Sequence, residues 1–136
     1  MSQPRTGGCL CGAIRYETVG DPVFTLRCHC RDCQRQSGAA HVPAARVPSA
    51  GFRILQGTPR RYVTKADSGN EIVRVFCGDC GTPLYVQVST RPDLVGLRVT
   101  TFDVPMPYNA KLEQLCMPQA ERVVTAVKRL MTRGQG

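Results

Sequence analysis

The chain alternates apolar and polar side chains over many short stretches that glycine and proline separate. Residues 13–19 (AIRYETV) are the clearest case, because Ile14, Tyr16 and Thr18 alternate with charged residues. A period of two is typical of a strand with one buried face. Similar patterns predict strands at 23–27, 51–55, 61–64, 71–76, 84–88 and 95–101. Several of them carry an arginine between apolar neighbours, which predicts an antiparallel sheet with one solvent-exposed face.

Two segments have the pattern of helices. Residues 32–40 could form one or two turns, and residues 119–133 form a longer helix. The second segment carries an apolar stripe at i, i+1, i+4, i+7 and i+8, made by Val123, Val124, Val127, Leu130 and Met131. Residues 1–7 and 134–136 are expected to be loose ends. The pattern therefore predicts a mainly β protein with a C-terminal helix, in a single domain over residues 1–136.

Length and composition narrow the class of protein. A chain of 136 residues fits one domain, and no stretch approaches the ~18 apolar residues that a membrane span needs. The first 30 residues contain charges and no apolar run, so we expect no secretory signal and a cytoplasmic location. In a reducing compartment, the eight cysteines are more often metal ligands or catalytic thiols than disulfides.

Seven of the eight cysteines fall into three groups. Cys77 and Cys80 form a CGDC knuckle whose flanking glycines let two thiolates aim at one metal ion. A closed structural zinc site needs four ligands, and Cys9 and Cys11 are the natural second pair. The alternative is that CGDC is a redox dithiol, which its position after a strand rather than at a helix start disfavours.

The third group differs in its chemistry. Cys28, Cys30 and Cys33 could bind one Zn²⁺ by themselves and leave one coordination position open, as in a catalytic zinc site. Zinc with three thiolates is a weak Lewis acid, better suited to capturing an incoming thiol than to making hydroxide. The alternative is a second structural site, whose fourth ligand would be His29, His41 or Cys116.

The order GGCLCGAIRYE, CHCRDCQRQSGAA and FCGDCGTPLY resembles the family of glutathione-dependent formaldehyde-activating enzymes, which includes centromere protein V. The resemblance covers about residues 7–103. It implies a β-tent fold, in which antiparallel sheets meet at a structural zinc. It also implies two sets of metal ligands, Cys9, Cys11, Cys77 and Cys80 for the structural zinc and Cys28, Cys30 and Cys33 for a catalytic zinc.

The resemblance implies an activity as well. The family is named for adding glutathione to formaldehyde to give S-hydroxymethylglutathione, the reverse of a carbon–sulfur lyase reaction. The hypothesis for this chain is that the thiol takes the open position on the Cys28/Cys30/Cys33 zinc, loses its proton and attacks the aldehyde. Because glutathione carries carboxylates, Arg31 and Arg35 beside this group are the predicted anion contacts.

Two other functions compete with this enzyme. One is a zinc-stabilised binding module without catalysis. The other is nucleic-acid binding, which the formal net charge of +8 suggests. The basic residues are scattered and only eight aromatic residues are available for stacking, so nucleic acid is disfavoured as a partner. Seven thiolates on two zinc ions would also change the charge by 4 − 7 = −3, to about +5.

Overall fold

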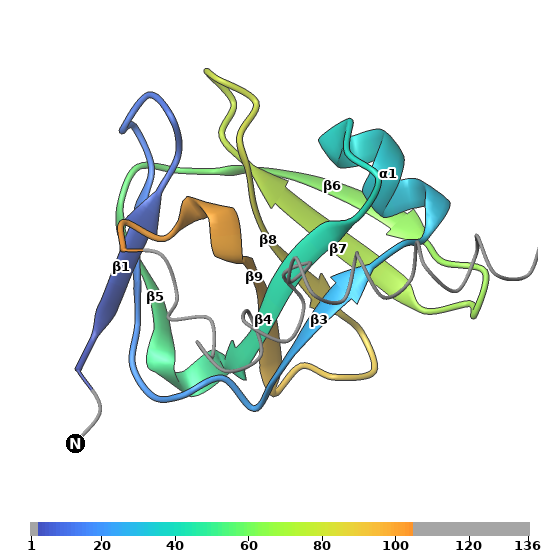
Figure 1. Ribbon diagram of the computed structural model, residues 1–136, viewed down its shortest axis with the longest axis horizontal. Helices are drawn as coiled ribbons and strands as arrows, with labels where there is room; N and C mark the ends of the chain where they lie inside the picture. Colours follow the sequence, from blue (N-terminus) through green and yellow to red (C-terminus); the bar gives the residue numbers. More distant parts are fainter. Residues whose placement is uncertain (1–2, 105–136) are drawn as a thin grey trace, which may run out of the picture. The chain divides into compact units, whose positions relative to one another are not determined.

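Antiparallel strands make up about half of residues 3–104, the part of the chain that the computed structural model describes (Figure 1). These residues form nine strands: β1 (Arg5–Gly8), β2 (Arg15–Thr18), β3 (Phe24–Cys28), β4 (Val42–Pro48), β5 (Phe52–Gln56), β6 (Arg60–Lys65), β7 (Glu71–Phe76), β8 (Pro83–Val88) and β9 (Leu94–Arg98). One α-helix and two 3-10 turns accompany them: α1 (Arg31–Ser37), η1 (Ser49–Gly51) and η2 (Val99–Thr101). The prediction of a mainly β, antiparallel fold is confirmed.

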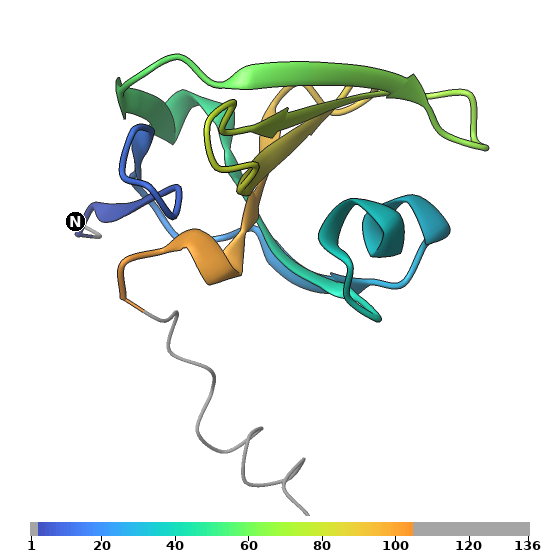
Figure 2. The same cartoon turned by 90° about the horizontal axis from the view of Figure 1, so that it is seen from above.

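The strands form two sheets. One has the order β1-β2-β5, and the other has the order β3-β4-β9-β8-β7-β6. The strand pairings within both sheets are antiparallel. Figure 2 shows that the six-stranded sheet is curved, with α1 on its concave side and β1 and β5 on the opposite side.

Aromatic side chains join the two sheets. Tyr16 of β2 is fully buried, and its ring lies 5.7 Å from that of Phe52 at the start of β5. The Phe52 ring in turn packs edge-on against Tyr85 of the six-stranded sheet, with centroids 4.9 Å apart. Val75 and Leu97 are fully buried in the same cluster. The core therefore lies between the sheets, where aromatic burial contributes strongly to stability.

The prediction that residues 1–7 are a loose end is wrong for Arg5 to Gly7. These residues belong to β1, which pairs with β2. A Cβ atom at Gly7 would lie 2.4 Å from the Tyr16 hydroxyl, so the backbone of β1 packs directly against this side chain. A strand that packs through glycine shows no apolar alternation, and the sequence pattern therefore does not reveal it.

The sequence pattern also fails to predict β4. Its sequence VPAARVP contains two prolines, and proline is normally confined to edge strands because it cannot donate to the ladder. Yet β4 lies inside the six-stranded sheet, with Pro43 opposite Arg27 of β3. Along its other edge, β4 pairs with β9 from Ala44 to Pro48.

The helix predicted at 32–40 is confirmed as α1, although it ends earlier, at Ser37. Gly38 follows with φ of 68° and donates its N–H to the Gln34 carbonyl at 2.8 Å, which terminates the helix. On the concave face of the sheet, Arg74 and Arg98 contact α1 and are only 6% and 4% exposed. The prediction that the arginine-bearing face is exposed to solvent is therefore wrong at these two positions, because the helix covers them.

Some predictions concern other parts of the chain. The helix predicted at 119–133 and Cys116 lie outside the described residues, and the single domain over 1–136 stays a prediction. Within residues 3–104, no helix has the length and apolar character needed to cross a membrane.

Candidate metal centres

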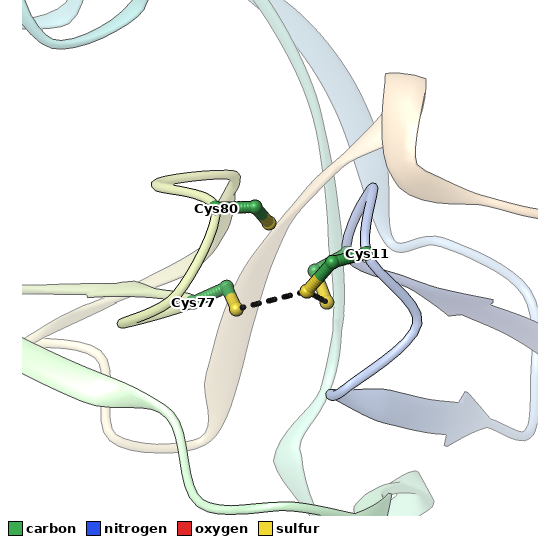
Figure 3. A group of neighbouring side chains, drawn as sticks. Cys11, Cys77 and Cys80 are labelled. Atoms are coloured by element: carbon green, nitrogen blue, oxygen red, sulfur yellow. Dashed lines mark hydrogen bonds between the residues drawn. The ribbon is translucent and has the colours of Figure 1, made fainter.

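The first cysteine cluster joins two loops that are far apart in the sequence. Cys9 and Cys11 lie in the loop between β1 and β2, and Cys77 and Cys80 lie in the turn between β7 and β8 (Figure 3). All four Sγ atoms lie within 4.8 Å of one another. The Sγ atoms of Cys9 and Cys11 are 3.5 Å apart, and those of Cys11 and Cys77 are 3.7 Å apart. The pairing predicted from the sequence is therefore the one that the fold brings together.

Backbone hydrogen bonds shape both loops. The N–H of Gly81 donates to the Cys77 carbonyl at 3.0 Å, which closes the CGDC turn, and Gly81 adopts a φ of 73°. In the other loop the N–H of Cys9 donates to the Ile14 carbonyl at 3.1 Å. The Ile14 N–H returns a hydrogen bond to the Cys9 Sγ at 3.2 Å. These turns direct the sulfur atoms toward one point.

The cysteines of this cluster differ widely in acidity. The hydroxyl of Thr82, 3.1 Å from the Cys80 Sγ, and the Thr82 N–H lower the pKa of Cys80 to about 5. The Ala13 N–H lowers the pKa of Cys11, but the sulfurs of Cys9 and Cys80 outweigh it and raise that pKa to about 12. Thiolates this close repel one another, so they ionise in separate steps. A divalent cation among them removes this repulsion.

The donor set fits such a cation. In a tetrahedral site with Zn–S bonds of about 2.3 Å, neighbouring sulfurs lie about 3.8 Å apart. The observed 3.5 and 3.7 Å are close to that value. The part of the chain that the structure describes contains seven cysteines, and all seven are free thiols. Four thiols within 4.8 Å of one another, two of them buried, could hold a metal ion as a closed structural site.

The second cluster lies at the start of α1. Cys28 ends β3, Cys30 is the N-cap of the helix, and Cys33 lies in its first turn. Their three Sγ atoms lie within 4.8 Å of one another, and those of Cys28 and Cys30 are 3.4 Å apart. The Cys33 N–H donates to the Cys30 Sγ at 3.5 Å. The strand-to-helix junction thus gathers three thiols at one place.

The surroundings of this cluster favour one thiolate over another. The hydrogen bond from the Cys33 N–H lowers the pKa of Cys30, which is exposed to solvent. Burial raises the pKa of Cys33 to about 12. Within residues 3–104, no fourth histidine, cysteine or carboxylate joins the three thiols. His29 and His41, the histidines considered as fourth ligands, instead stack on each other with ring centroids 5.2 Å apart.

The structure places the predicted anion contacts on the exposed surface of α1. Neither Arg31 nor Arg35 forms an ion pair within the described part of the chain, and their role stays a prediction. The sequence reasoning missed Arg74 and Arg98, which contact α1 from β7 and β9. Their one signal in the sequence is an arginine between apolar neighbours, which by itself does not indicate which face is covered.

Fold and clusters together define a small, mainly antiparallel β protein with two cysteine groups that could each hold a metal ion. The family model for glutathione-dependent formaldehyde-activating enzymes matches residues 4–119. The chain belongs to this family.

Individual proteins resemble the chain as well. A Halomonas elongata protein that carries the name of the same family is 26% identical over 107 residues, which cover 74% of this chain and 67% of that protein. A solved structure of a Rhodobacter sphaeroides protein is similar in fold, with a TM-score of 0.59 and 23% identity. That similarity covers 75% of this chain and 91% of the other, and it bears on the fold alone.

Proposed function

We propose that the protein is an enzyme that adds a thiol, glutathione or a similar one, to formaldehyde to give an S-hydroxymethyl adduct. Membership of the family supports the reaction, and the cluster of Cys28, Cys30 and Cys33 supports its location. The observation that carries the proposal is that this cluster offers three thiols at a strand-to-helix junction, one exposed and two partly buried, without a fourth donor from the described residues.

In this proposal the three thiols would hold a catalytic zinc ion. Zinc bound there would lower the pKa of a further thiol, whose sulfur would then be a nucleophile at neutral pH. The chain contributes the positioning of the three sulfurs. The hydrogen bond from the Cys33 N–H stabilises the Cys30 thiolate, and the turn of helix between them fixes their spacing.

The reaction needs no nucleophile from the protein. The sulfur of the thiol forms a bond to the formaldehyde carbon, the carbon–oxygen double bond becomes single, and the proton of the thiol ends on that oxygen. Atoms balance without an oxidant or a further reactant. The reverse reaction breaks the carbon–sulfur bond, so we assign the enzyme to the carbon–sulfur lyases.

We propose a different role for the cluster of Cys9, Cys11, Cys77 and Cys80. The four thiols would hold a zinc ion as a closed structural site, which would tie the loop after β1 to the turn after β7. The proposal requires all seven thiols in their reduced form, which fits a reducing compartment such as the cytoplasm.

Exchange NMR of ¹³C-formaldehyde and glutathione tests this function. The zinc-loaded protein should exchange formaldehyde with its glutathione adduct faster than buffer alone does. Cys28→Ser should abolish the acceleration and reduce the zinc content from two ions to one per chain, while the folded state persists. Exchange at the buffer rate with fully metallated protein would leave the non-catalytic binding module as the function.

Cys116→Ser separates an open second site from a closed one. If the cluster takes its fourth ligand from the substrate, this variant should keep both zinc ions and the wild-type exchange rate. Loss of one zinc ion from Cys116→Ser would instead indicate a second structural site with four protein ligands.

A further inference from the structure

Two arginines of the six-stranded sheet share a face with the Cys28 thiol. In antiparallel pairs, residues opposite each other point to the same face, as do residues two positions along a strand. Cys28 lies opposite Val42 of β4, and Arg98 of β9 lies opposite Ala44, two positions further along β4. Arg46 comes two positions after Ala44. All of them therefore belong to the face on which α1 lies (Figure 2).

A glycine determines where the Arg46 charge lies. Arg46 is opposite Gly96 of β9, and a Cβ atom at Gly96 would lie 2.7 Å from Nη1 and 2.9 Å from Cζ of Arg46. The guanidinium therefore rests on the backbone of β9, in space that a side chain would fill. Burial and then the charge of Arg98 lower the pKa of Arg46, so the two guanidiniums lie close enough to repel each other.

Within residues 3–104, these two cations differ from their neighbour in lacking a carboxylate partner. Arg74, on the same face, forms an ion pair with Asp32 of α1 at 3.0 Å. No carboxylate of residues 3–104 forms an ion pair with Arg46 or Arg98. The side chain of Arg98 donates from Nη2 to the neutral Oε1 of Gln36 at 2.6 Å. Burying a cation without an anion is costly, so this face favours a negatively charged ligand.

The cysteine cluster lies beside the same arginines. Arg98 contacts Gln36, which follows Cys33 by three residues in α1, and Cys28 belongs to the same face of the sheet as both arginines. A ligand that binds the arginines therefore has its remaining atoms close to the three thiols. A guanidinium binds a carboxylate through two parallel hydrogen bonds, which also orients it.

We propose that Arg46 and Arg98 bind a carboxylate of the thiol whose sulfur reacts at the Cys28/Cys30/Cys33 cluster. This inference rests on the proposed function and narrows its substrate class to thiols that carry a carboxylate. The competing explanation is that the two arginines only balance the charge of the thiolates. In that case Arg46 affects metal binding and has no effect on the choice of thiol.

Binding of S-methylglutathione and of its diethyl ester to the zinc-loaded protein tests the proposal. The methylated sulfur has no proton to lose, so calorimetry reports recognition of the carboxylates without the reaction. The wild-type protein should bind the acid about tenfold more tightly than the ester, as expected for charge-assisted hydrogen bonds. Arg46→Met should remove this difference, and Arg46→Lys, which keeps the charge without the planar fork, should remove part of it.

Arg27→Met is the matched control. Arg27 precedes Cys28 in β3, but its side chain belongs to the opposite face and is exposed, so this variant should keep the preference for the acid. Equal affinity of the wild-type protein for acid and ester would overturn the proposal. So would an Arg46→Met variant that keeps the preference but loses zinc.

The outcomes also separate this inference from the proposed function. Accelerated formaldehyde exchange together with equal binding of acid and ester would reject the carboxylate site alone. Exchange at the buffer rate together with Arg46-dependent binding of the acid would reject the enzyme and keep the carboxylate site.

Discussion

At the scale of single residues, Tyr16 shows how burial links the fold to pH. Its ring is fully buried between the sheets, and its hydroxyl lies 2.7 Å from Thr101 Oγ1. Burial raises its pKa to about 12, above the usual value of 10.0. A raised pKa in the folded state means that the folded protein holds its proton more firmly than the unfolded chain. The associated stability is fully present below pH 10 and declines as the pH rises toward 12.

Tyr16→Phe should therefore change the pH dependence of unfolding. In the wild-type protein the free energy of unfolding should fall between about pH 10 and 12, and the variant should show a shallower fall. At pH 7 the free energy of unfolding of the variant should be lower by about 1 kcal/mol, because the variant lacks the hydrogen bond to Thr101. Urea unfolding followed by far-UV circular dichroism measures both effects. Tyr62→Phe, at a position that is 59% exposed, is the control and should keep the wild-type slope.

Gly96 offers a second prediction at this scale. A Cβ atom there would lie 2.8 Å from Val86 Cγ2 as well as 2.7 Å from Arg46 Nη1, so Gly96→Ala should lose about 1–3 kcal/mol of stability. Part of this loss comes from the clash with Arg46. The double variant Gly96→Ala/Arg46→Met should therefore lose less than the sum of the single variants in urea unfolding. Additive losses would show that Arg46 does not lie over Gly96.

Sequence reasoning identified the cysteines of both clusters but not the arginines of the sheet beside the second one. The spacing of the cysteines indicates a metal site, because few roles other than metal binding need thiols only one or two residues apart. The arginines at 46, 74 and 98 occur between apolar neighbours in strands, and alternation reveals two faces without indicating what covers either. Only the position of α1 distinguishes a buried arginine from an exposed one.

At the scale of elements, the CGDC turn depends on one backbone conformation. Gly81 has a φ of 73°, and a Cβ atom there would meet nothing within 4 Å, so the constraint is conformational and not steric crowding by neighbours. Gly81→Ala should lower the free energy of unfolding by about 1 kcal/mol, because left-handed backbone is strained for alanine. Gly81→Asn should lower the free energy of unfolding by less, since asparagine tolerates the left-handed region. Equal losses for the two variants in urea unfolding would contradict a conformational requirement at Gly81.

The helix α1 is attached to the sheet by a buried arginine. Arg74 donates to Asp32, whose side chain is 49% exposed, so the ion pair is only partly shielded from water. Asp32→Asn should lower the free energy of unfolding by about 1–2 kcal/mol, because it leaves the Arg74 guanidinium without a charged partner. Asp67→Asn, in the exposed turn between β6 and β7, should have no effect in the same thermal or urea unfolding experiment.

Most strands are predictable from alternation, and the exceptions share a cause. The pattern predicts β7 with its observed bounds, Glu71–Phe76, since Val73 and Val75 flank Arg74 in a run rich in β-branched residues. It misses β1 and β4, whose sequences RTGG and VPAARVP are rich in glycine or in alanine and proline. Such strands are stabilised by neighbouring strands on both edges or by close backbone packing. The local sequence does not show which strands will be their neighbours.

At the scale of the whole described unit, the first cysteine cluster connects the two sheets. The loop of Cys9 and Cys11 belongs to the three-stranded sheet, and the turn of Cys77 and Cys80 belongs to the six-stranded sheet. A metal ion bound there would hold both sheets together, in addition to the aromatic core. The second cluster lies at one end of α1 and connects no distant elements.

The two clusters should therefore differ in their effect on stability. Cys77→Ser should lower the free energy of unfolding by on the order of 5 kcal/mol, because the binding energy of a structural zinc is also folding energy. Cys28→Ser should change it by less than about 1 kcal/mol while it abolishes formaldehyde exchange. Thermal unfolding with zinc analysis of each variant measures this contrast. Equal destabilisation by both variants would contradict the division into a structural and a catalytic site.

The proposed chemistry depends most on whether the Cys28/Cys30/Cys33 cluster accepts the sulfur of a substrate. Absorption spectroscopy of the protein loaded with Co²⁺ in place of zinc tests this directly, since sulfur-to-cobalt charge transfer grows with the number of bound thiolates. We predict that glutathione raises this absorption by about one-seventh, from seven sulfur ligands to eight, and that S-methylglutathione does not. A spectrum that glutathione leaves unchanged would show that no substrate sulfur reaches the metal, and would contradict the proposed chemistry.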